Sequence, residues 1–333
     1  MTTKLKYILR RPWFRIAASL LILGVLMAFL PLHKVAAALR ILPLSLWLMV
    51  LVGFLATHLI GAAKWRFTLG LGKAHLTFPQ AVRCYFAGVF GTVFLPSVVG
   101  GDLVRMGLAF RIEHNHAGVL LGSLVDRLLD FVALAVVAGI AVVLLPGTLS
   151  ERHRHAFVAV AILFAIACAA TLAVLMFMPW RRLPFKLRRL TVKLRRAARA
   201  IASRPQYVLV SLALSVLIQL SLLSLAVALA NGCGLHLDFR VWLLVWPLAK
   251  LVSLAPLTLG GLGIREAGLV AMLAPFGAAP ALAVAAGLAW ESIVAGGGLC
   301  AGLISFLIGG SAFARTVLHF NRLRSSPELS DAA

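Results

Sequence analysis

Long apolar runs recur along this chain, and each run of about 20 residues is long enough to cross the roughly 30 Å hydrocarbon core of a bilayer. We predict six spanning helices, at residues 14–32, 41–62, 117–146, 156–179, 207–231 and 280–308. Helices satisfy their own backbone hydrogen bonds inside hydrocarbon, where water is absent. The sequence therefore predicts an all-α polytopic membrane protein, with residues 1–333 forming a single membrane domain.

The composition fits this class and excludes others. Hydrophobic residues make up 62% of the chain and charged residues 13%, with a mean hydropathy of +1.01. The net charge of +22 raises the question of nucleic-acid binding, but the basic residues cluster between apolar runs without a zinc-finger or RNP pattern. We therefore expect no nucleic-acid partner. The four cysteines are far apart, lack Cys-x-x-Cys pairing and predict neither a metal site nor a disulfide framework.

Two further apolar segments, residues 81–110 and 241–275, are interrupted by the same ten-residue pattern. It reads Pro-x-x-x-Gly-Gly-x-x-x-Arg and occurs at Pro96–Arg105 and again, 160 positions later, at Pro256–Arg265. Broken segments at corresponding positions of two halves are the best sequence indication of a substrate site in a transporter. The pattern therefore favours a membrane carrier over a soluble enzyme.

The distribution of Lys and Arg predicts how the chain threads the membrane. Loop 180–206 holds ten Lys/Arg and no acid, so we expect a basic cytoplasmic loop, with both termini also cytoplasmic and the protein in the inner (plasma) membrane. Four spans lie between the N-terminus and that loop, counting run 14–32 as retained rather than cleaved as a signal peptide. Segment 81–110 must then fold back as a re-entrant hairpin or two short crossings, and segment 241–275 folds back from the opposite side.

This count predicts an internal repeat. Residues 14–146 contain three spans and hairpin 81–110, and residues 156–308 contain three spans and hairpin 241–275. An odd number of crossings turns the second half upside down relative to the first. We therefore expect about six spanning helices plus two re-entrant helical hairpins, arranged in two inverted repeats.

The broken segments supply the predicted substrate site. Irregular backbone at membrane depth must face protein or a cavity, so we expect the glycines to face the protein centre; they are Gly100, Gly101, Gly260, Gly261 and Gly263. Each glycine turn should precede a short helix, 102–110 or 264–273, whose N-terminus suits an anion. Arg105 and Arg265 lie near the first turns of these helices, and arginine matches phosphate geometry.

A structural interpretation of the same residues stays open. Gly-Gly pairs also permit close helix packing. Asp102 is a possible N-cap, and Arg265 beside Glu266 is a possible structural ion pair.

Ionisable residues also occur near the middle of two predicted spans. Asp126 and Asp130 lie one turn apart on one face, with Arg127 beside them, and Glu291 occupies a similar depth in the last span. Charged side chains at that depth usually face a cavity or a partner. They either couple protons to transport or form internal salt bridges, such as Asp130 or Glu291 to Arg105 or Arg265, that hold the halves together. Lys250 is a weaker candidate because its side chain can snorkel.

The stretches Leu95–Arg105 and Gly260–Ala267 resemble the paired motifs of the lysylphosphatidylglycerol synthase transmembrane family. These flippase-like proteins are related to the N-terminal flippase domain of the multiple peptide resistance factor. The resemblance covers about residues 10 to 310, with Gly-Gly-Leu-Gly-x-Arg-Glu as its most specific part. It implies lipid translocation between leaflets, with substrate contacts at Asp102, Arg105, Arg265 and Glu266. Leu259 departs from the family, which often has proline at that position.

The resemblance leaves the cargo open, because family members are also tied to hopanoid handling and archaeal glycolipids. No soluble synthase domain follows the last span, so we expect no lysylphosphatidylglycerol synthesis and no enzyme activity. We expect a flippase-like transporter that moves an anionic or polyprenyl-linked (glyco)lipid between leaflets, with membrane lipids as partners, no cofactor, and homo-oligomerisation left open. The alternative is a non-ATPase subunit or scaffold of a membrane lipid- or glycosyl-transferase pathway.

Overall fold

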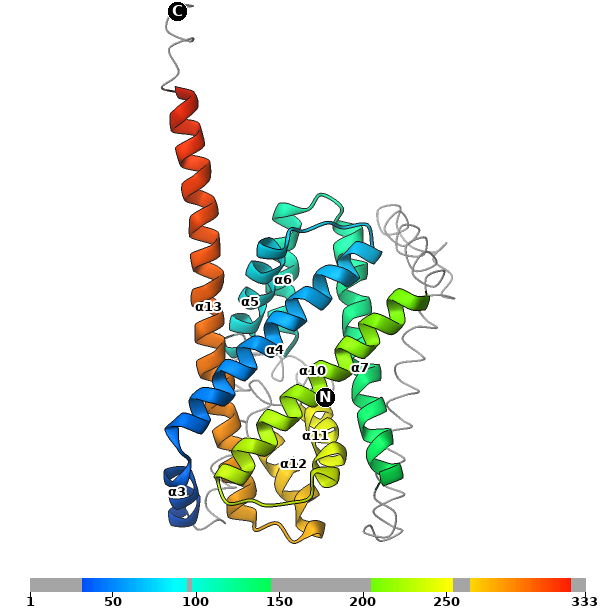
Figure 1. Ribbon diagram of the computed structural model, residues 1–333, viewed down its shortest axis with the longest axis vertical. Helices are drawn as coiled ribbons and strands as arrows, with labels where there is room; N and C mark the ends of the chain where they lie inside the picture. Colours follow the sequence, from blue (N-terminus) through cyan, green and yellow to red (C-terminus); the bar gives the residue numbers. More distant parts are fainter. Residues whose placement is uncertain (1–31, 95–97, 145–204, 254–263, 325–333) are drawn as a thin grey trace, which may run out of the picture.

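The computed structural model describes residues 32–94, 98–144, 205–253 and 264–324, and all regular elements in these ranges are helical (Figure 1). The elements are α3 (Leu32–Ile41), α4 (Leu44–Leu71), α5 (Phe78–Phe94), α6 (Val98–Ile112), α7 (His116–Leu144), α10 (Pro205–Gly232), α11 (Phe239–Ser253), α12 (Ile264–Leu273), the 3₁₀ turn η2 (Ala274–Phe276) and α13 (Pro280–Arg324). The predicted all-α class is confirmed for the described residues.

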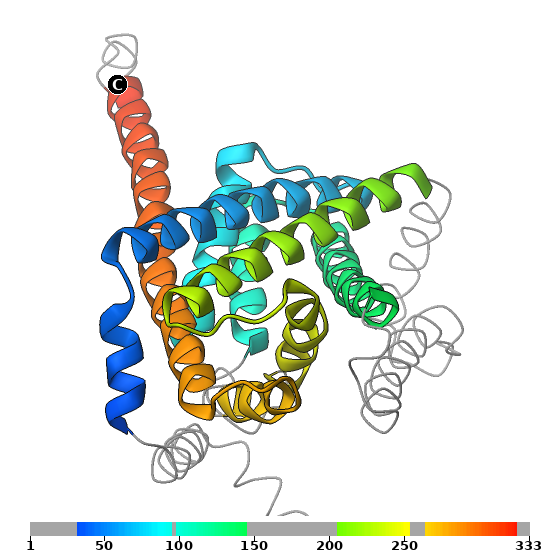
Figure 2. The ribbon, with the colours of Figure 1, turned by 60° about the horizontal axis from the view of Figure 1, so that its bottom comes forward.

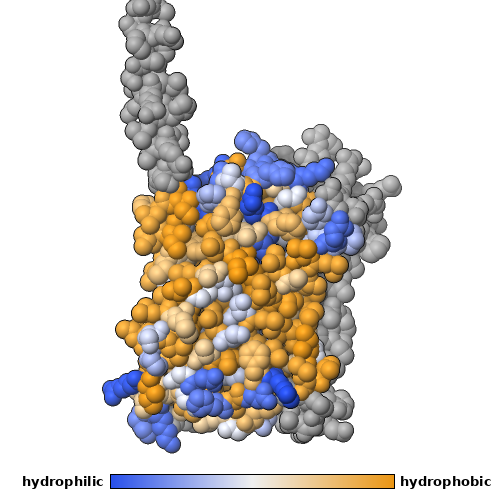
Figure 3. Space-filling model, in the orientation of Figure 1, coloured by the Kyte–Doolittle hydropathy of each residue, from blue (hydrophilic) through white to orange (hydrophobic). Residues whose placement is uncertain are grey.

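Four of the described helices, α4, α7, α10 and α13, are long and apolar enough to span a bilayer. They correspond to the predicted spans 41–62, 117–146, 207–231 and 280–308. On the face drawn in Figure 3, a broad apolar belt separates hydrophilic ends, as expected of a multi-pass membrane protein. The predicted spans 14–32 and 156–179 and the basic loop 180–206 lie outside the described residues.

Helix α4 continues to Leu71, beyond the predicted end at residue 62. The apolar run stops before Lys64, but the helix does not. The Lys64 side chain is only 2% exposed, and its ammonium lies 3.0 Å from the carboxylate of Asp126 on α7. Because a partner inside the protein neutralises its charge, this lysine does not mark the end of the buried helix.

The two interrupted segments each form a pair of helices, as predicted, and the pairs lie toward opposite ends of the molecule. Helices α5 and α6 pack together in the upper part of Figure 1, and α11 and α12 pack together in the lower part. Each pair also contacts a long helix of the other half, because α5 packs against α13 and α11 packs against α7. Helices α4 and α10 lie side by side in both ribbon views (Figure 2).

The start of α6 corrects the prediction of a glycine turn before a helix at residues 102–110. Helix α6 begins at Val98 and contains both Gly100 and Gly101. A Cβ atom on Gly101 would lie 2.4 Å from the carbonyl oxygen of Gly88 and 2.4 Å from Cγ2 of Thr92, both on α5. The absence of a side chain therefore lets α6 lie close against α5. The second predicted helix, residues 264–273, coincides with α12.

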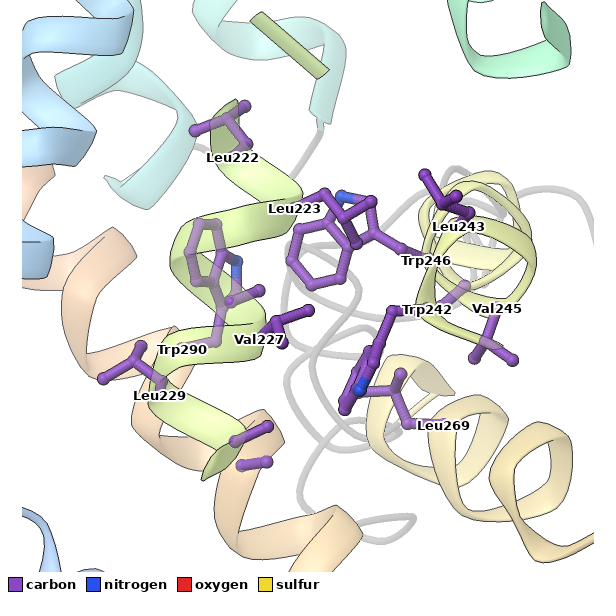
Figure 4. Packing of buried hydrophobic residues seen from close by; sticks show 14 of the residues in the cluster. Leu222, Leu223, Val227, Leu229, Trp242, Leu243, Val245, Trp246, Leu269 and Trp290 are labelled. Atoms are coloured by element: carbon purple, nitrogen blue, oxygen red, sulfur yellow. The ribbon is translucent and has the colours of Figure 1, made fainter. Parts of the chain in front are cut away.

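The largest hydrophobic core of the described residues lies mainly among α10, α11, α12 and α13. Its buried tryptophans are Trp242 and Trp246 on α11 and Trp290 on α13. Figure 4 shows Trp246 beside Leu223 of α10 and Trp242 beside Leu269 of α12. The rings of Trp246 and Trp290 are nearly perpendicular, with centroids 5.0 Å apart. This edge-to-face contact fixes one wall of the cavity that contains the candidate site.

Candidate functional site

A cavity of about 480 Å³ lies between the two halves of the chain and is bordered by α4, α5, α6, α7, α10, α11, α12 and α13. Its volume is in the range of small-molecule sites, roughly 300–1,000 Å³. The walls combine aromatic rings with ionisable side chains. The ionisable acids and cations along the cavity are Asp102, Arg105, Arg127, Asp130, Lys250, Arg265 and Glu291.

Six charged residues of the first half form one connected set, which we call the first-half network. It consists of Lys64, Asp102, Arg105, Asp126, Arg127 and Asp130. At its centre, the Lys64 ammonium pairs with both Asp126 and Asp130. It also donates to the hydroxyl of Ser215 on α10 at 2.9 Å, and that hydroxyl donates to Asp130 at 3.0 Å. The network therefore contacts the second half through α10.

Arg105 lines the cavity and is held in place on three sides. Its Nη2 donates to Asp126 Oδ2 at 3.1 Å, and its Nε lies 3.1 Å from Asp102 Oδ1. The guanidinium carbon also lies 5.2 Å from the ring centroid of Trp65 and 5.5 Å from that of Tyr85. Cation–π contacts of this kind add to the ion pairs. The predicted anion ligand is thus nearly buried and already paired with carboxylates.

Arg127 is the most exposed cation of the first-half network, with 42% of its side chain accessible. It binds the Asp102 carboxylate through two nitrogens: Nε donates to Oδ2 at 2.6 Å, and Nη2 donates to Oδ1. Its Nη1 lies 3.6 Å from Asp130. The suggested N-cap role of Asp102 is wrong, because this residue lies inside α6 and ties α6 to α7.

In the second half, two carboxylates share one guanidinium. Arg265 Nη2 donates to Glu266 Oε1 at 2.9 Å, and Arg265 Nη1 lies 2.7 Å from Glu291 Oε1. Nη2 also donates to the carbonyl oxygen of Gly287 at 3.1 Å. These contacts join α12 to α13, within one half of the chain. Of the predicted salt bridges, Glu291 to Arg265 is therefore present, but it does not join the halves, and Asp130 pairs with Lys64 and Arg127 instead.

The structure brings together most of the predicted site residues that it describes. Those that line the cavity are Gly101, Asp102, Arg105, Arg127, Asp130, Arg265 and Glu291. Gly100, Asp126 and Glu266 are buried and do not line it. The glycines at 260, 261 and 263 lie outside the described residues. Among the residues that are described, no group of three or more His, Cys, Asp or Glu side chains has a geometry that could hold a metal ion.

The sequence analysis missed Lys64 of the first-half network and His58 of the cavity wall. No local feature of the sequence distinguishes a paired lysine such as Lys64 from a snorkelling one. His58 lines the cavity. It lies within an apolar run, and an ionisable residue in a predicted span could have been recognised from the sequence as a candidate site residue. Lys250, the weaker candidate, also lines the cavity and donates to Gln219 on α10 at 2.8 Å.

The family described as "Lysylphosphatidylglycerol synthase TM region" matches residues 13–302, which is most of the chain. No significant match was found among curated proteins or solved structures.

Proposed function

The chain belongs to the lysylphosphatidylglycerol synthase transmembrane-region family, and we propose that it is a transporter that moves lipids between the leaflets of the inner membrane. The observation that carries this proposal is the cavity between the halves. It places seven acidic or basic side chains of Asp, Glu, Lys and Arg among helices of which four are apolar enough to span a bilayer. Charged side chains inside the membrane-spanning part of a protein usually mark the path of a polar cargo.

We infer that the lipid headgroup enters this cavity while the acyl chains stay in the bilayer. Arginine and lysine side chains from both halves line it, which favours an anionic, phosphate-bearing headgroup, including that of a polyprenyl-linked glycolipid. Transfer of this kind needs no bond to be made or broken. We therefore propose a carrier without a catalytic role or a cofactor.

We further propose that the two halves are inverted repeats. The packing of α5 on α13 has a counterpart in the packing of α11 on α7, and α4 lies against its counterpart α10. The two hairpins also lie at opposite ends of the molecule (Figure 1). Repeats of this type open their central site alternately to the two sides by rocking of one part against the other. The basic loop 180–206 and both termini would then face the cytoplasm.

The test is a transfer assay with purified protein in vesicles that contain an anionic lipid reporting its leaflet. We expect wild-type protein to accelerate movement of the reporter above protein-free vesicles. Arg265→Lys keeps the charge but loses the planar fork, and the loss of a charge-assisted contact of about 1.5 kcal/mol should slow transfer roughly tenfold. The matched control is Arg240→Lys, the same change at a residue with 60% of its side chain exposed and outside the cavity, which should leave transfer unchanged.

Two results would contradict the proposal. One is wild-type protein that moves neither anionic phospholipids nor polyprenyl phosphates faster than protein-free vesicles. The other is an Arg265→Lys variant as fast as the Arg240→Lys control. The first result would favour the alternative, a non-ATPase subunit or scaffold of a lipid- or glycosyl-transferase pathway.

A further inference from the structure

We propose that Glu291 is the proton carrier of the transport cycle. An anionic headgroup that binds Arg265 displaces the Glu291 carboxylate, which then takes up a proton, so that the lipid anion and the proton cross together. This inference rests on the proposed lipid transport and deepens it, since it assigns the coupling residue of the same cavity.

The first observation is an imbalance of charge around Arg265. The first-half network contains three cations and three carboxylates, each paired within the network. The Arg265 guanidinium, by contrast, is shared by two carboxylates, Glu266 at 2.9 Å and Glu291 at 2.7 Å. Two carboxylates on one cation repel each other, and such pairs readily hold a proton between them. Around Arg265, one carboxylate can therefore be neutralised while the cation keeps the other as its partner.

The second observation is that only one of these two carboxylates is accessible. The Glu266 side chain is completely buried and does not line the cavity. Its Cγ also packs closely against α13, because a Cβ atom on Gly287 would lie only 3.1 Å away. Glu291 is 21% exposed and, like Arg265, lines the cavity. A headgroup that enters the cavity thus meets the contact between Arg265 and Glu291, while Glu266 stays behind Arg265.

The surroundings of Glu291 favour neutralisation once Arg265 is taken by a phosphate. The helices that pack against α13 bring few titratable groups to this part of the cavity: α12 contributes Arg265, with Glu266 buried behind it, α4 contributes His58, and α5 contributes Tyr85. Helix α10 contributes the neutral Gln219, and no described residue of α3 lines the cavity. Helix α11 contributes Lys250, a cation that favours the incoming phosphate. Arg127 and Asp130 on α7 also line the cavity and pair within the first-half network. A carboxylate that has lost its cation away from water takes up a proton rather than remain ionised.

The exchange conserves charge. In the empty state, the group of Arg265, Glu266 and Glu291 contains one cation and two carboxylates. In the loaded state, it contains the same cation, the Glu266 carboxylate, the phosphate anion and a neutral Glu291. The proton comes from water on the side where the lipid enters, and it returns to water on the other side when Glu291 pairs with Arg265 again. One monoanionic lipid and one proton therefore cross with no net movement of charge.

The prediction is tested in vesicles by imposing a pH gradient and a membrane potential separately. The probe is a leaflet-reporting, monoanionic phosphatidylglycerol, and the steady-state ratio of reporter between the leaflets is measured. For wild-type protein, a gradient of one pH unit should shift that ratio about tenfold, because one proton accompanies each lipid. A membrane potential of about 59 mV would change the reporter ratio tenfold if one net charge crossed with each lipid. For wild-type protein it should leave the reporter ratio unchanged, because no net charge crosses.

Glu291→Gln should reverse both responses, because glutamine cannot take up a proton. Its lipid ratio should ignore the pH gradient and shift about tenfold with the potential. The matched control is Asp238→Asn, the same acid-to-amide change at a residue with 58% of its side chain exposed and outside the cavity, which should respond as wild type does.

The proposal is overturned if the Glu291→Gln variant keeps the tenfold response to pH. It is also overturned if wild-type protein responds to the potential and not to the pH gradient, a measurement that needs no variant and so does not depend on how Glu291→Gln folds. Failure of wild-type protein to move any lipid would instead contradict the transport function itself, so the two failures are distinguishable.

Discussion

Gly101 lies where α6 comes closest to α5, and we expect an added methyl group there to force the two helices apart. In Gly101→Ala, the new Cβ would lie 2.4 Å from the Gly88 carbonyl oxygen and from Thr92 Cγ2, whereas ordinary contact begins at 3.4 Å. Helix α6 must therefore move by about 1 Å. Neither neighbour yields easily, since one is backbone and the Thr92 hydroxyl donates to the Val89 carbonyl at 2.6 Å. Overpacking of this kind costs about 1–3 kcal/mol.

The same helix supplies a matched control. A Cβ atom on Gly107 would meet nothing within 4 Å, so Gly107→Ala makes the same chemical change without a clash. Alanine favours helix over glycine by about 1 kcal/mol, and this variant should be neutral or stabilised. Because the gain in helix propensity is common to both variants, they should differ by the overpacking cost alone, about 1–3 kcal/mol in the free energy of unfolding. Thermal unfolding in detergent measures the difference, and a Gly101→Ala protein that unfolds at or above the temperature of Gly107→Ala would refute the packing role.

Two further predictions concern charged residues. Lys64→Met leaves the buried Asp126 and the partly buried Asp130 without their shared cation and should lower the free energy of unfolding by about 3–5 kcal/mol. Adding Asp126→Asn should restore part of this loss in the same unfolding assay, and no recovery would contradict the pairing. Glu113, in the loop after α6, accepts backbone N–H groups of Asn115 and His75, which lower the pKa of its carboxyl below the ordinary 4.5. The stabilisation of this loop contact is therefore complete above pH 4.5 and lost as the pH falls through the lowered pKa. Hydrogen exchange of the His75 amide should show this acid-induced loosening in wild type and not in Glu113→Gln.

The positions of the helices were largely predictable, because each long helix coincides with an apolar run and each helix pair with an interrupted one. The start of α6 was not predictable in the same way. A glycine inside a helix costs about 1 kcal/mol relative to alanine, so Gly100 and Gly101 indicated a turn. The close contact between Gly101 and Gly88 offsets that cost. Such a contact depends on the approach of two helices and has no signature within a single one.

The charged residues were predictable in kind but not in pairing. Helical periodicity correctly placed Asp126 and Asp130 on one face, and both pair with the same ammonium. Their partner, Lys64, lies more than 60 residues earlier, and its choice depends on how α4 and α7 are rotated about their axes. The same holds for Arg127, which pairs with Asp102 across the boundary between α6 and α7. Sequence spacing fixes which residues share a helix face, but only packing decides which faces meet.

The charged contacts of the first half are harder to break than the contact between Arg265 and Glu291, and this difference indicates which helices move when the cavity opens. Lys64 and Asp126 are 2% and 1% exposed, and breaking a buried pair of this kind costs about 3–5 kcal/mol. A motion that separated α4, α6 and α7 would have to break several such contacts at once. The contact of Arg265 with Glu291 is partly open to the cavity, so a headgroup can replace one of its members at less cost. We therefore expect the first-half network to hold α4, α6 and α7 together as a rigid frame, and the helices around Arg265 to rearrange when cargo binds and leaves.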